Sequence, residues 1–278
     1  MSEVTAQHGI FRDTNLHIED TGGDGRPVVL IHGWPLSGES WSQQVPALQQ
    51  AGYRVITYDR RGFGRSDKPS SGYDYDSLAG DLQMVLTELS LTDVTLVGFS
   101  MGGGEVARYL TRLGPALVHS VVFASAVPPY LLHTADNPDG PLEQSQADGW
   151  AHQLTEDADA FYDAFVTQFF SADGTLMVSE EQRQQALAQC KQASLRAALG
   201  CMEAFGTTDF RGDLPNVTVP ALVVHGDADA TVPFEGSGRR THQAIVGSLL
   251  HVIAGGPHGC NVSHADEFNR ALLQFLEV

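Results

Sequence analysis

The chain has 278 residues and a net charge of −18, from 16 basic and 34 acidic side chains. Hydrophobic residues make up 42% of it, which is enough apolar material for one large globular domain or two small ones. Because a strongly negative surface repels polyanions, the charge argues against nucleic acids or anionic membranes as partners.

Three cysteines are odd in number and lack the spacing of metal ligands: Cys190, Cys201 and Cys260. They indicate free thiols of a reducing compartment. No apolar run reaches the roughly 20 residues of a membrane span. The first residues lack the basic and apolar regions of a signal peptide. We therefore expect a cytoplasmic protein without a membrane partner, and leave open whether it forms a homo-oligomer.

Apolar runs bounded by turn residues predict the strands of a sheet. Residues 1–13 are expected to form a tail or an edge strand, and the alternating residues 15–20 a further strand. The runs 27–32 and 53–58 are expected to form strands buried on both faces, because such strands are continuously apolar. Further strands are expected at residues 94–97, 118–124, 221–225 and 249–253.

Apolar residues at helical spacing predict helices between these strands. One helix is expected to end near residue 50, and a second to begin near residue 76. Two more are expected at residues 105–113 and 265–276. Alternation of strands and helices predicts an α/β fold, a mostly parallel sheet with helices on both faces.

Residues 128–212 differ in character from the rest. They begin with Pro128-Pro129 and continue with helix-like stretches rich in Gln, Ala and Phe, without a strand pattern. We expect a helical cap here, inserted between a first core part, 1–127, and a second, 213–278. Such an insertion lies over the carboxyl ends of the strands, where α/β sheets bind ligands.

The stretch Gly98-Phe99-Ser100-Met101-Gly102 follows a predicted strand and precedes a helix. This is the pattern of a nucleophile elbow, a sharp turn that projects a serine hydroxyl away from the backbone. A crowded turn requires residues without side chains on both sides of the serine. Free N–H groups at the start of the helix favour negative charge at the same place. Ser100 is therefore the candidate nucleophile.

A serine nucleophile needs a base and an acid that orients the base. In this type of fold both follow the serine, the acid first. His258 is the candidate base, because it lies in a glycine-rich loop just after the last strand. His225 ends a strand and is expected to be a packing residue. Asp227 and Asp229 both follow that strand and are both candidate acids.

The developing oxyanion also needs hydrogen-bond donors. One is the backbone N–H of Met101, and a second comes from the loop 32–35. Since Pro35 has no N–H, this donor is Trp34. The side chains of Trp34 and Phe99 are expected to line the pocket.

No cofactor or metal is expected. Gly62 and Gly64 follow a strand, but Asp67 stands where the dinucleotide-binding pattern needs its third glycine. No phosphate-binding loop occurs, and no pair of histidines has the spacing of zinc ligands.

Together these residues resemble the α/β-hydrolase superfamily, and within it the cofactor-free (non-heme) haloperoxidases, bacterial aryl esterases and perhydrolases, a group that also includes a γ-lactamase. The resemblance extends from about residue 14 to the end and is weakest in the cap. It rests on residues 32–36, 52–66, 72–76, 97–102, 208–211, 225–229 and 257–259.

The resemblance implies a triad of Ser100, Asp229 and His258, with Trp34 and Met101 as oxyanion donors. It also implies an apolar pocket suited to small aryl or short-acyl esters. Further pocket positions by resemblance are Val127, Leu131, Phe161, Phe165, Thr231 and Val232. For Phe161 and Phe165, packing of the cap against the core is an equal interpretation.

The expected reaction is ester hydrolysis through an acyl-enzyme. The partners are a small ester, or a carboxylate plus hydrogen peroxide, which gives a peracid that oxidises halide. A lactam or amide hydrolase would use the same triad, and a non-catalytic receptor could retain it. A haloalkane dehalogenase or an epoxide hydrolase would carry Asp at position 100, so Ser100 argues against both.

Overall fold

The computed structural model describes residues 2–8 and 11–277, and its centre is an eight-stranded sheet. The strands lie in the order β1-β2-β4-β3-β5-β6-β9-β10. β1 and β2 form an antiparallel hairpin at one edge, β2 pairs antiparallel with β4, and the remaining neighbours are parallel. The strands are β1 (Ser2–His8), β2 (Phe11–Asp20), β3 (Pro27–Ile31), β4 (Arg54–Tyr58), β5 (Val94–Phe99), β6 (Val118–Ala124), β9 (Ala221–Gly226) and β10 (Leu249–Ile253). The predicted α/β class is confirmed. Of the expected tail or edge strand over residues 1–13, residues 2–8 form the edge strand β1 and 11–13 belong to β2, whereas 1, 9 and 10 lie outside the described residues.

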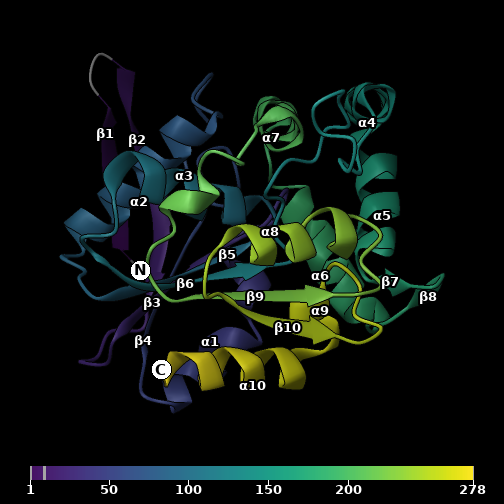
Figure 1. The fold of residues 1–278 in the computed structure, drawn as a ribbon. Helices are drawn as coiled ribbons and strands as arrows, with labels where there is room; N and C mark the ends of the chain where they lie inside the picture. The colour runs from purple at the N-terminus through teal and green to yellow at the C-terminus, as the bar shows by residue number, and fades with distance from the viewer. Residues whose placement is uncertain (1, 9–10, 278) are drawn as a thin grey trace.

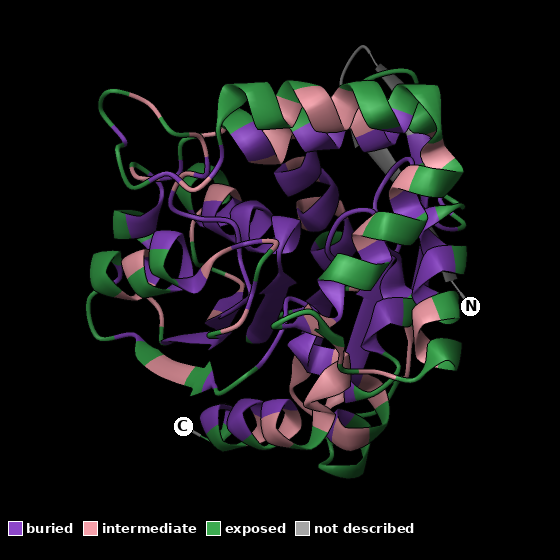
Figure 2. Ribbon diagram, turned by 90° about the vertical axis from the view of Figure 1, so that its right-hand side faces the viewer, coloured by how far each residue is buried: buried purple, intermediate pink, exposed green. Residues whose placement is uncertain are grey.

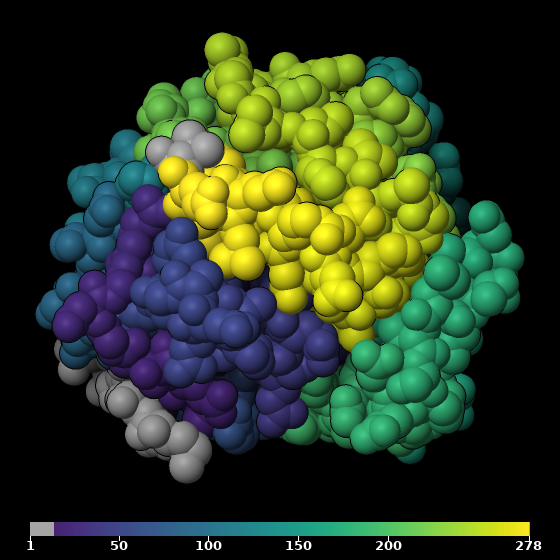
Figure 3. Space-filling view, turned by 90° about the horizontal axis from the view of Figure 1, so that it is seen from below, coloured from purple at the N-terminus to yellow at the C-terminus, as the bar shows by residue number. Residues whose placement is uncertain are grey.

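Helices cover both faces of the sheet (Figure 1). On one face lie α2 (Tyr75–Glu88), α3 (Met101–Leu113) and α8 (Gly238–Ala244), and on the other α1 (Gln44–Gln50) and α10 (Ala265–Leu276). Figure 3 shows the C-terminal helix beside the N-terminal part of the chain, in agreement with the contact between α1 and α10. The short helices are η1 (Gly38–Trp41), η2 (Leu214–Asn216), η3 (Phe234–Gly236) and α9 (Cys260–Ser263).

Local sequence explains where the central helices begin and end. Asp74 caps α2, because its carboxylate accepts the backbone N–H of Ser77 at 2.9 Å. α3 ends at Leu113, and the next residue, Gly114, has a φ of 78° that suits glycine. β3, β5, β6 and β9 are buried almost throughout, as expected for strands covered on both faces.

The segment between β6 and β9 carries the helices α4 (Gln144–Glu156), α5 (Ala158–Phe169), α6 (Glu180–Cys190) and α7 (Leu195–Thr207). It lies at the carboxyl ends of the strands (Figure 1), and Figure 2 shows helices with exposed outer and buried inner faces. We propose residues 128–212 as the cap and 1–127 and 213–278 as the two parts of the core.

The expectation of no strand in the cap is wrong. Two short strands, β7 (Ser171–Ala172) and β8 (Thr175–Leu176), pair antiparallel around a tight turn. Asp173 and Gly174 in this turn both have positive φ, 49° and 76°, as hairpin turns of two residues require. Two residues are too few for a visible alternation of polar and apolar side chains.

None of the helices in the described part of the chain is long and apolar enough to cross a membrane. The three cysteines are buried and form no disulfide.

Candidate active site

The turn between β5 and α3 holds Ser100 in a strained conformation, with φ 54° and ψ −117°. Gly98 and Gly102, on either side of Ser100, cannot carry a side chain because other backbone atoms lie too close to them. A Cβ on Gly98 would lie 2.5 Å from the carbonyl oxygen of Gly102, and a Cβ on Gly102 would lie 2.7 Å from that of Ile31. Such distances are too short for any side chain, so the turn has the backbone geometry of a nucleophile elbow.

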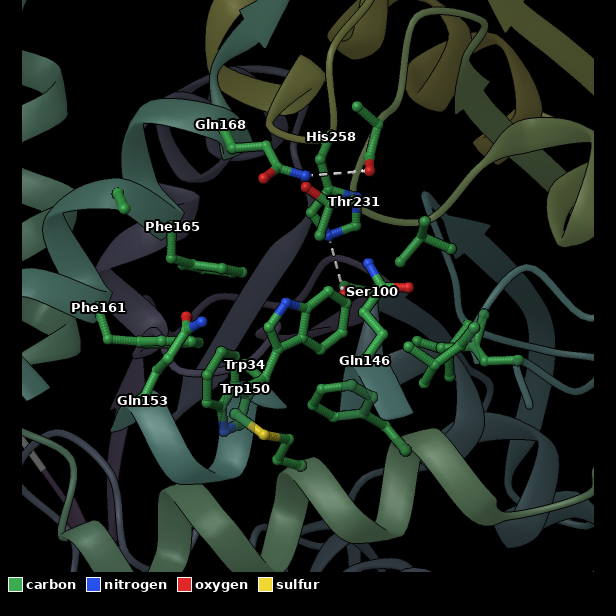
Figure 4. A pocket seen from close by; sticks show the side chains of 18 of the residues that line it. Trp34, Ser100, Gln146, Trp150, Gln153, Phe161, Phe165, Gln168, Thr231 and His258 are labelled. Atoms are coloured by element: carbon green, nitrogen blue, oxygen red, sulfur yellow. Dashed lines mark hydrogen bonds between the residues drawn. The ribbon is translucent and has the colours of Figure 1, made fainter. Parts of the chain in front are cut away.

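Three predicted residues from distant parts of the sequence meet at this turn. His258 Nε2 lies 2.9 Å from the hydroxyl oxygen of Ser100 (Figure 4). His258 Nδ1 lies 2.7 Å from Oδ2 of Asp229. All three side chains are at least nine-tenths buried. The second candidate acid, Asp227, is exposed and accepts the N–H of Gly255 at 2.6 Å, which is a turn-stabilising role.

Asp229 is held by more than His258. Its Oδ1 accepts the N–H groups of Thr231 at 2.9 Å and Val232 at 2.7 Å. His225 Nε2 lies 3.2 Å from Oδ2 of Asp229 and donates to the carbonyl of Val232 at 2.8 Å. The sequence indicated only packing for His225. That interpretation does not include the polar contact of His225 with Asp229.

The surroundings of Asp229 favour its ionised form. Burial alone would raise the pKa of this carboxyl. The opposite effects of His258 and of the hydrogen bond with His225 outweigh burial, so the pKa of Asp229 lies well below its usual value. Asp229 is therefore a carboxylate at neutral pH.

Two peptide groups next to Ser100 are anchored through their carbonyls. The Ser100 carbonyl accepts the N–H groups of Gly103 and Val127, both at 3.1 Å. In a planar trans peptide the C=O and N–H point in opposite directions. The N–H of Met101, which shares this peptide, is therefore directed away from these two donors. Met101 is the first residue of α3, so its N–H has no acceptor within the helix. No backbone hydrogen bond from this N–H to another described residue is present.

The second anchored peptide joins Gly33 to Trp34. The Gly33 carbonyl accepts the N–H of Leu36 at 3.0 Å and Nδ1–H of His32 at 2.8 Å. The loop lies directly against the elbow, because a Cβ on Gly33 would come within 3.1 Å of Ser100 Cβ. The peptide between Trp34 and Pro35 is cis.

A cavity of about 480 Å³ opens above Ser100 and His258. Seven of the eight side chains predicted to line the pocket do so: Trp34, Val127, Leu131, Phe161, Phe165, Thr231 and Val232. The indole of Trp34 contacts Phe161, Phe165 and Phe205 at ring-centre distances of 5.1–6.2 Å. Its Nε1–H donates to the carbonyl of Ala198 at 2.9 Å, which fixes the ring.

Phe99 is the exception. It does not line the cavity and is 1% exposed. Its ring packs between Trp41 and Phe169 and lies 5.2 Å from the ring of His258. Phe99 is the last residue of β5, whereas Ser100 lies in the turn that follows, with φ 54° and ψ −117°. Proximity to Ser100 in sequence thus does not place Phe99 in the pocket.

The structure adds cavity residues that the sequence did not indicate. One face of α4 contributes side chains at positions i, i+4, i+7 and i+10, namely Gln146, Trp150, Gln153 and Glu156. This helical spacing could have revealed them once one member was known. The other additions are Pro141, Leu142, Asp157, Ala160, Ala164, Gln168, Met202, Phe205, Ala230 and Pro233.

Polar and acidic side chains also line the cavity. Gln168 of α5 donates to the carbonyl of Ala230 at 3.1 Å, which joins the cap to the loop after β9 (Figure 4). Glu156 and Asp157 bring carboxylates, and no Lys or Arg is among the lining residues. Within the described part of the chain, no group of three or more His, Cys, Asp or Glu residues could hold a metal ion.

Comparison with known proteins agrees with this geometry. The family model described as alpha/beta hydrolase fold matches residues 26–265. A putative non-heme chloroperoxidase from Synechocystis is 48% identical, and the match covers all of both chains. A bifunctional esterase/perhydrolase from Acinetobacter calcoaceticus is 35% identical over 99% of both. The crystal structure of a bromoperoxidase from Bacillus anthracis is 51% identical and covers both chains fully, with a TM-score of 0.95. The chain therefore belongs to the α/β-hydrolase family, in the group of the non-heme haloperoxidases and related esterases.

Proposed function

We propose that this enzyme hydrolyses small, uncharged carboxylic esters through an acyl-enzyme on Ser100. One observation carries the proposal. An unbroken chain of hydrogen-bond distances runs from Ser100 through His258 to Asp229, 2.9 and 2.7 Å long, and it opens into a largely apolar cavity. Relatives named as esterases and non-heme haloperoxidases support the same assignment.

In the proposed cycle the hydroxyl of Ser100 attacks the ester carbonyl while Nε2 of His258 accepts its proton. Asp229 accepts the hydrogen bond from Nδ1–H and stabilises the imidazolium that forms. The N–H groups of Trp34 and Met101 hold the oxyanion, and one such donor typically contributes about 3 kcal/mol in the transition state. His258 then protonates the leaving alcohol, and water attacks the acyl-enzyme with His258 again as base.

Hydrogen peroxide can replace water in the second half of the cycle. Its attack on the acyl-enzyme releases a peracid and restores Ser100. When the acyl group comes from a free carboxylic acid, the net reaction consumes acid and peroxide and gives peracid and water. The peracid then oxidises bromide to hypobromite outside the site and returns to the carboxylic acid. Halide oxidation is thus a second outcome of the same intermediate.

The cavity supports the proposed substrate class. Its volume of about 480 Å³ suits small ligands, and Trp34, Phe161 and Phe165 give it an aromatic wall. The hydroxyl of Thr231 has no hydrogen-bond partner among the described residues and offers one polar contact to substrate. The carboxylates of Glu156 and Asp157 disfavour anionic esters.

The test is a substrate panel on the purified protein and on Ser100→Ala. It contains p-nitrophenyl acetate, phenyl acetate, a negatively charged hemisuccinate ester, a γ-lactam, and acetate with peroxide and bromide. We expect rapid turnover of the neutral esters, slow turnover of the hemisuccinate, peroxide-dependent bromination, and loss of every activity in the variant. Lactam cleavage faster than ester hydrolysis would assign the amide alternative. Undiminished ester hydrolysis by Ser100→Ala would refute the proposal.

A further inference from the structure

A buried ion pair lies behind the candidate active site and has no part in the cycle above. Arg60 follows β4, Glu105 lies on α3, and both side chains are 0% exposed. Arg60 Nε donates to Glu105 Oε2 at 2.9 Å, and the hydroxyl of Tyr58 donates to the other carboxylate oxygen. Desolvation of two charges is costly, and well-packed apolar residues of similar volume often give equal or greater stability. Stability is therefore a weak explanation for this pair.

The pair connects the two elements that carry the proposed oxyanion donors. Glu105 belongs to α3, the helix that begins at Met101. Arg60 reaches the other element, because its Nη2 donates to the carbonyl of His32 at 2.8 Å. The backbone N–H of Arg60 donates to Nε2 of the same histidine at 2.9 Å. One arginine thus links the helix behind the nucleophile to the loop that presents Trp34.

His32 extends this link to the donor peptide itself. Because Nε2 accepts a hydrogen bond from Arg60, the ring proton of the neutral imidazole is on Nδ1. Nδ1–H donates to the carbonyl of Gly33 at 2.8 Å. Burial and the charge of Arg60 keep the pKa of His32 well below its usual value, so the ring stays neutral at neutral pH. The carbonyl of Gly33 and the N–H of Trp34 belong to one planar peptide, so fixing the carbonyl directs the N–H.

We propose that Arg60, Glu105 and His32 form a positioning network that sets the direction and spacing of the two oxyanion donors. The inference rests on the proposed function. These residues do not touch the substrate and act through the peptide between Gly33 and Trp34. Their loss should raise the barrier of the chemical step and leave binding of the uncharged ester almost unchanged, because the oxyanion exists only beyond the ground state.

A second buried ion pair provides a matched control. Arg61 Nε donates to Asp81 Oδ2 at 2.6 Å, and both side chains are at least nine-tenths buried. Arg61 adjoins Arg60 in sequence, but its partner lies on α2 instead of α3. Replacing this pair disturbs the core to a similar degree without disconnecting α3 from the loop at Trp34.

The experiment compares two double variants, Arg60→Met with Glu105→Met, and Arg61→Met with Asp81→Met. We measure kcat and KM for p-nitrophenyl acetate, inhibition by phenylboronic acid, whose tetrahedral adduct mimics the intermediate, and thermal unfolding. In the first variant we expect kcat to fall about 10- to 100-fold and boronate affinity to fall with it, at a KM within about twofold of wild type. In the control we expect kcat within about twofold.

Two single variants keep the test decisive where the first double variant does not fold. His32→Asn retains an N–H donor near the carbonyl of Gly33, whereas His32→Leu loses it. We expect Asn to preserve more kcat than Leu at similar melting temperatures. Equal kcat in these two variants, or full kcat in the folded Arg60 and Glu105 double variant, would overturn the network. If either result is found and Ser100→Ala is inactive, the positioning network is refuted but the proposed function is not. Activity in Ser100→Ala refutes the proposed function instead.

Discussion

The replacement Gly33→Ala tests how closely the loop 32–35, which carries the proposed oxyanion donor Trp34, is fitted to Ser100. A Cβ at this position would lie 2.7 Å from Cδ1 of Phe99 and 3.1 Å from Cβ of Ser100. Carbon atoms prefer separations of about 3.5–4.0 Å. Phe99 is buried against Trp41 and Phe169 and has little space to move. The loop must therefore shift by about 0.5–1 Å to accommodate the new methyl group.

That shift moves the N–H of Trp34 relative to the oxyanion. A misplacement of about 1 Å at an active site can reduce the rate about 100-fold, which corresponds to about 2.7 kcal/mol in the activation free energy. We expect kcat of Gly33→Ala for p-nitrophenyl acetate to fall by about this factor, while KM changes little. Overpacking should also reduce the free energy of unfolding by about 1–3 kcal/mol.

Steady-state hydrolysis and thermal unfolding are measured on the same preparation, with Gly149→Ala as control. Gly149 lies within α4, and a Cβ there has no neighbour within 4 Å. The control should keep its kcat and gain up to about 1 kcal/mol of stability from helix propensity. A folded Gly33→Ala with kcat within about threefold of wild type would refute the reasoning about the loop.

Three further predictions follow from the same geometry. Asp229→Asn should lower kcat by about 10⁴-fold because the amide favours the wrong tautomer of His258, whereas Asp227→Asn should lower kcat only slightly. Pre-steady-state and steady-state ester hydrolysis measure both, and a larger loss in Asp227→Asn would contradict the assignment. Pro35 restricts the conformation of the residue before it, and in Pro35→Leu we expect acetate-dependent bromination of monochlorodimedone to fall more than hydrolysis; an equal fall in both would assign Pro35 a purely structural role. Burial raises the pKa of Cys201 and Cys260 to about 12, and it also raises the pKa of Cys190. A disulfide reagent at pH 8 should therefore label no thiol in the folded protein and three after denaturation. Rapid labelling of the native protein would contradict the burial of these cysteines.

The parts of the fold that follow from local patterns could be predicted from the sequence. The continuous apolar runs around Val29 and Leu96 indicated buried parallel strands, and the structure contains them. The elbow was recognisable because only glycine fits at Gly98 and Gly102. The roles of the residues that meet there stay predictions, although the structure brings them within hydrogen-bonding distance.

The remaining features depend on long-range packing, which local patterns do not record. In the sequence, His225 looks like any buried strand residue. Its contact with Asp229 exists only because the loop after β9 folds back against the end of the strand. The cavity face of α4 was hidden because Gln146 and Gln153 are polar, as on any exposed helix. Arg60 and Glu105 are 45 positions apart in sequence, and only the pairing of β4 with the centre of the sheet brings them together.

We propose that one acyl-enzyme on Ser100 serves both ester hydrolysis and peroxide-dependent halide oxidation. The most direct test is a titration with phenylmethylsulfonyl fluoride, in which intact mass and both activities are followed on the same samples and the adduct is located by peptide mapping. We expect one adduct per chain at Ser100, with both activities falling in proportion to the labelled fraction. Bromination that persists in fully labelled protein, or an adduct on another residue, would contradict it.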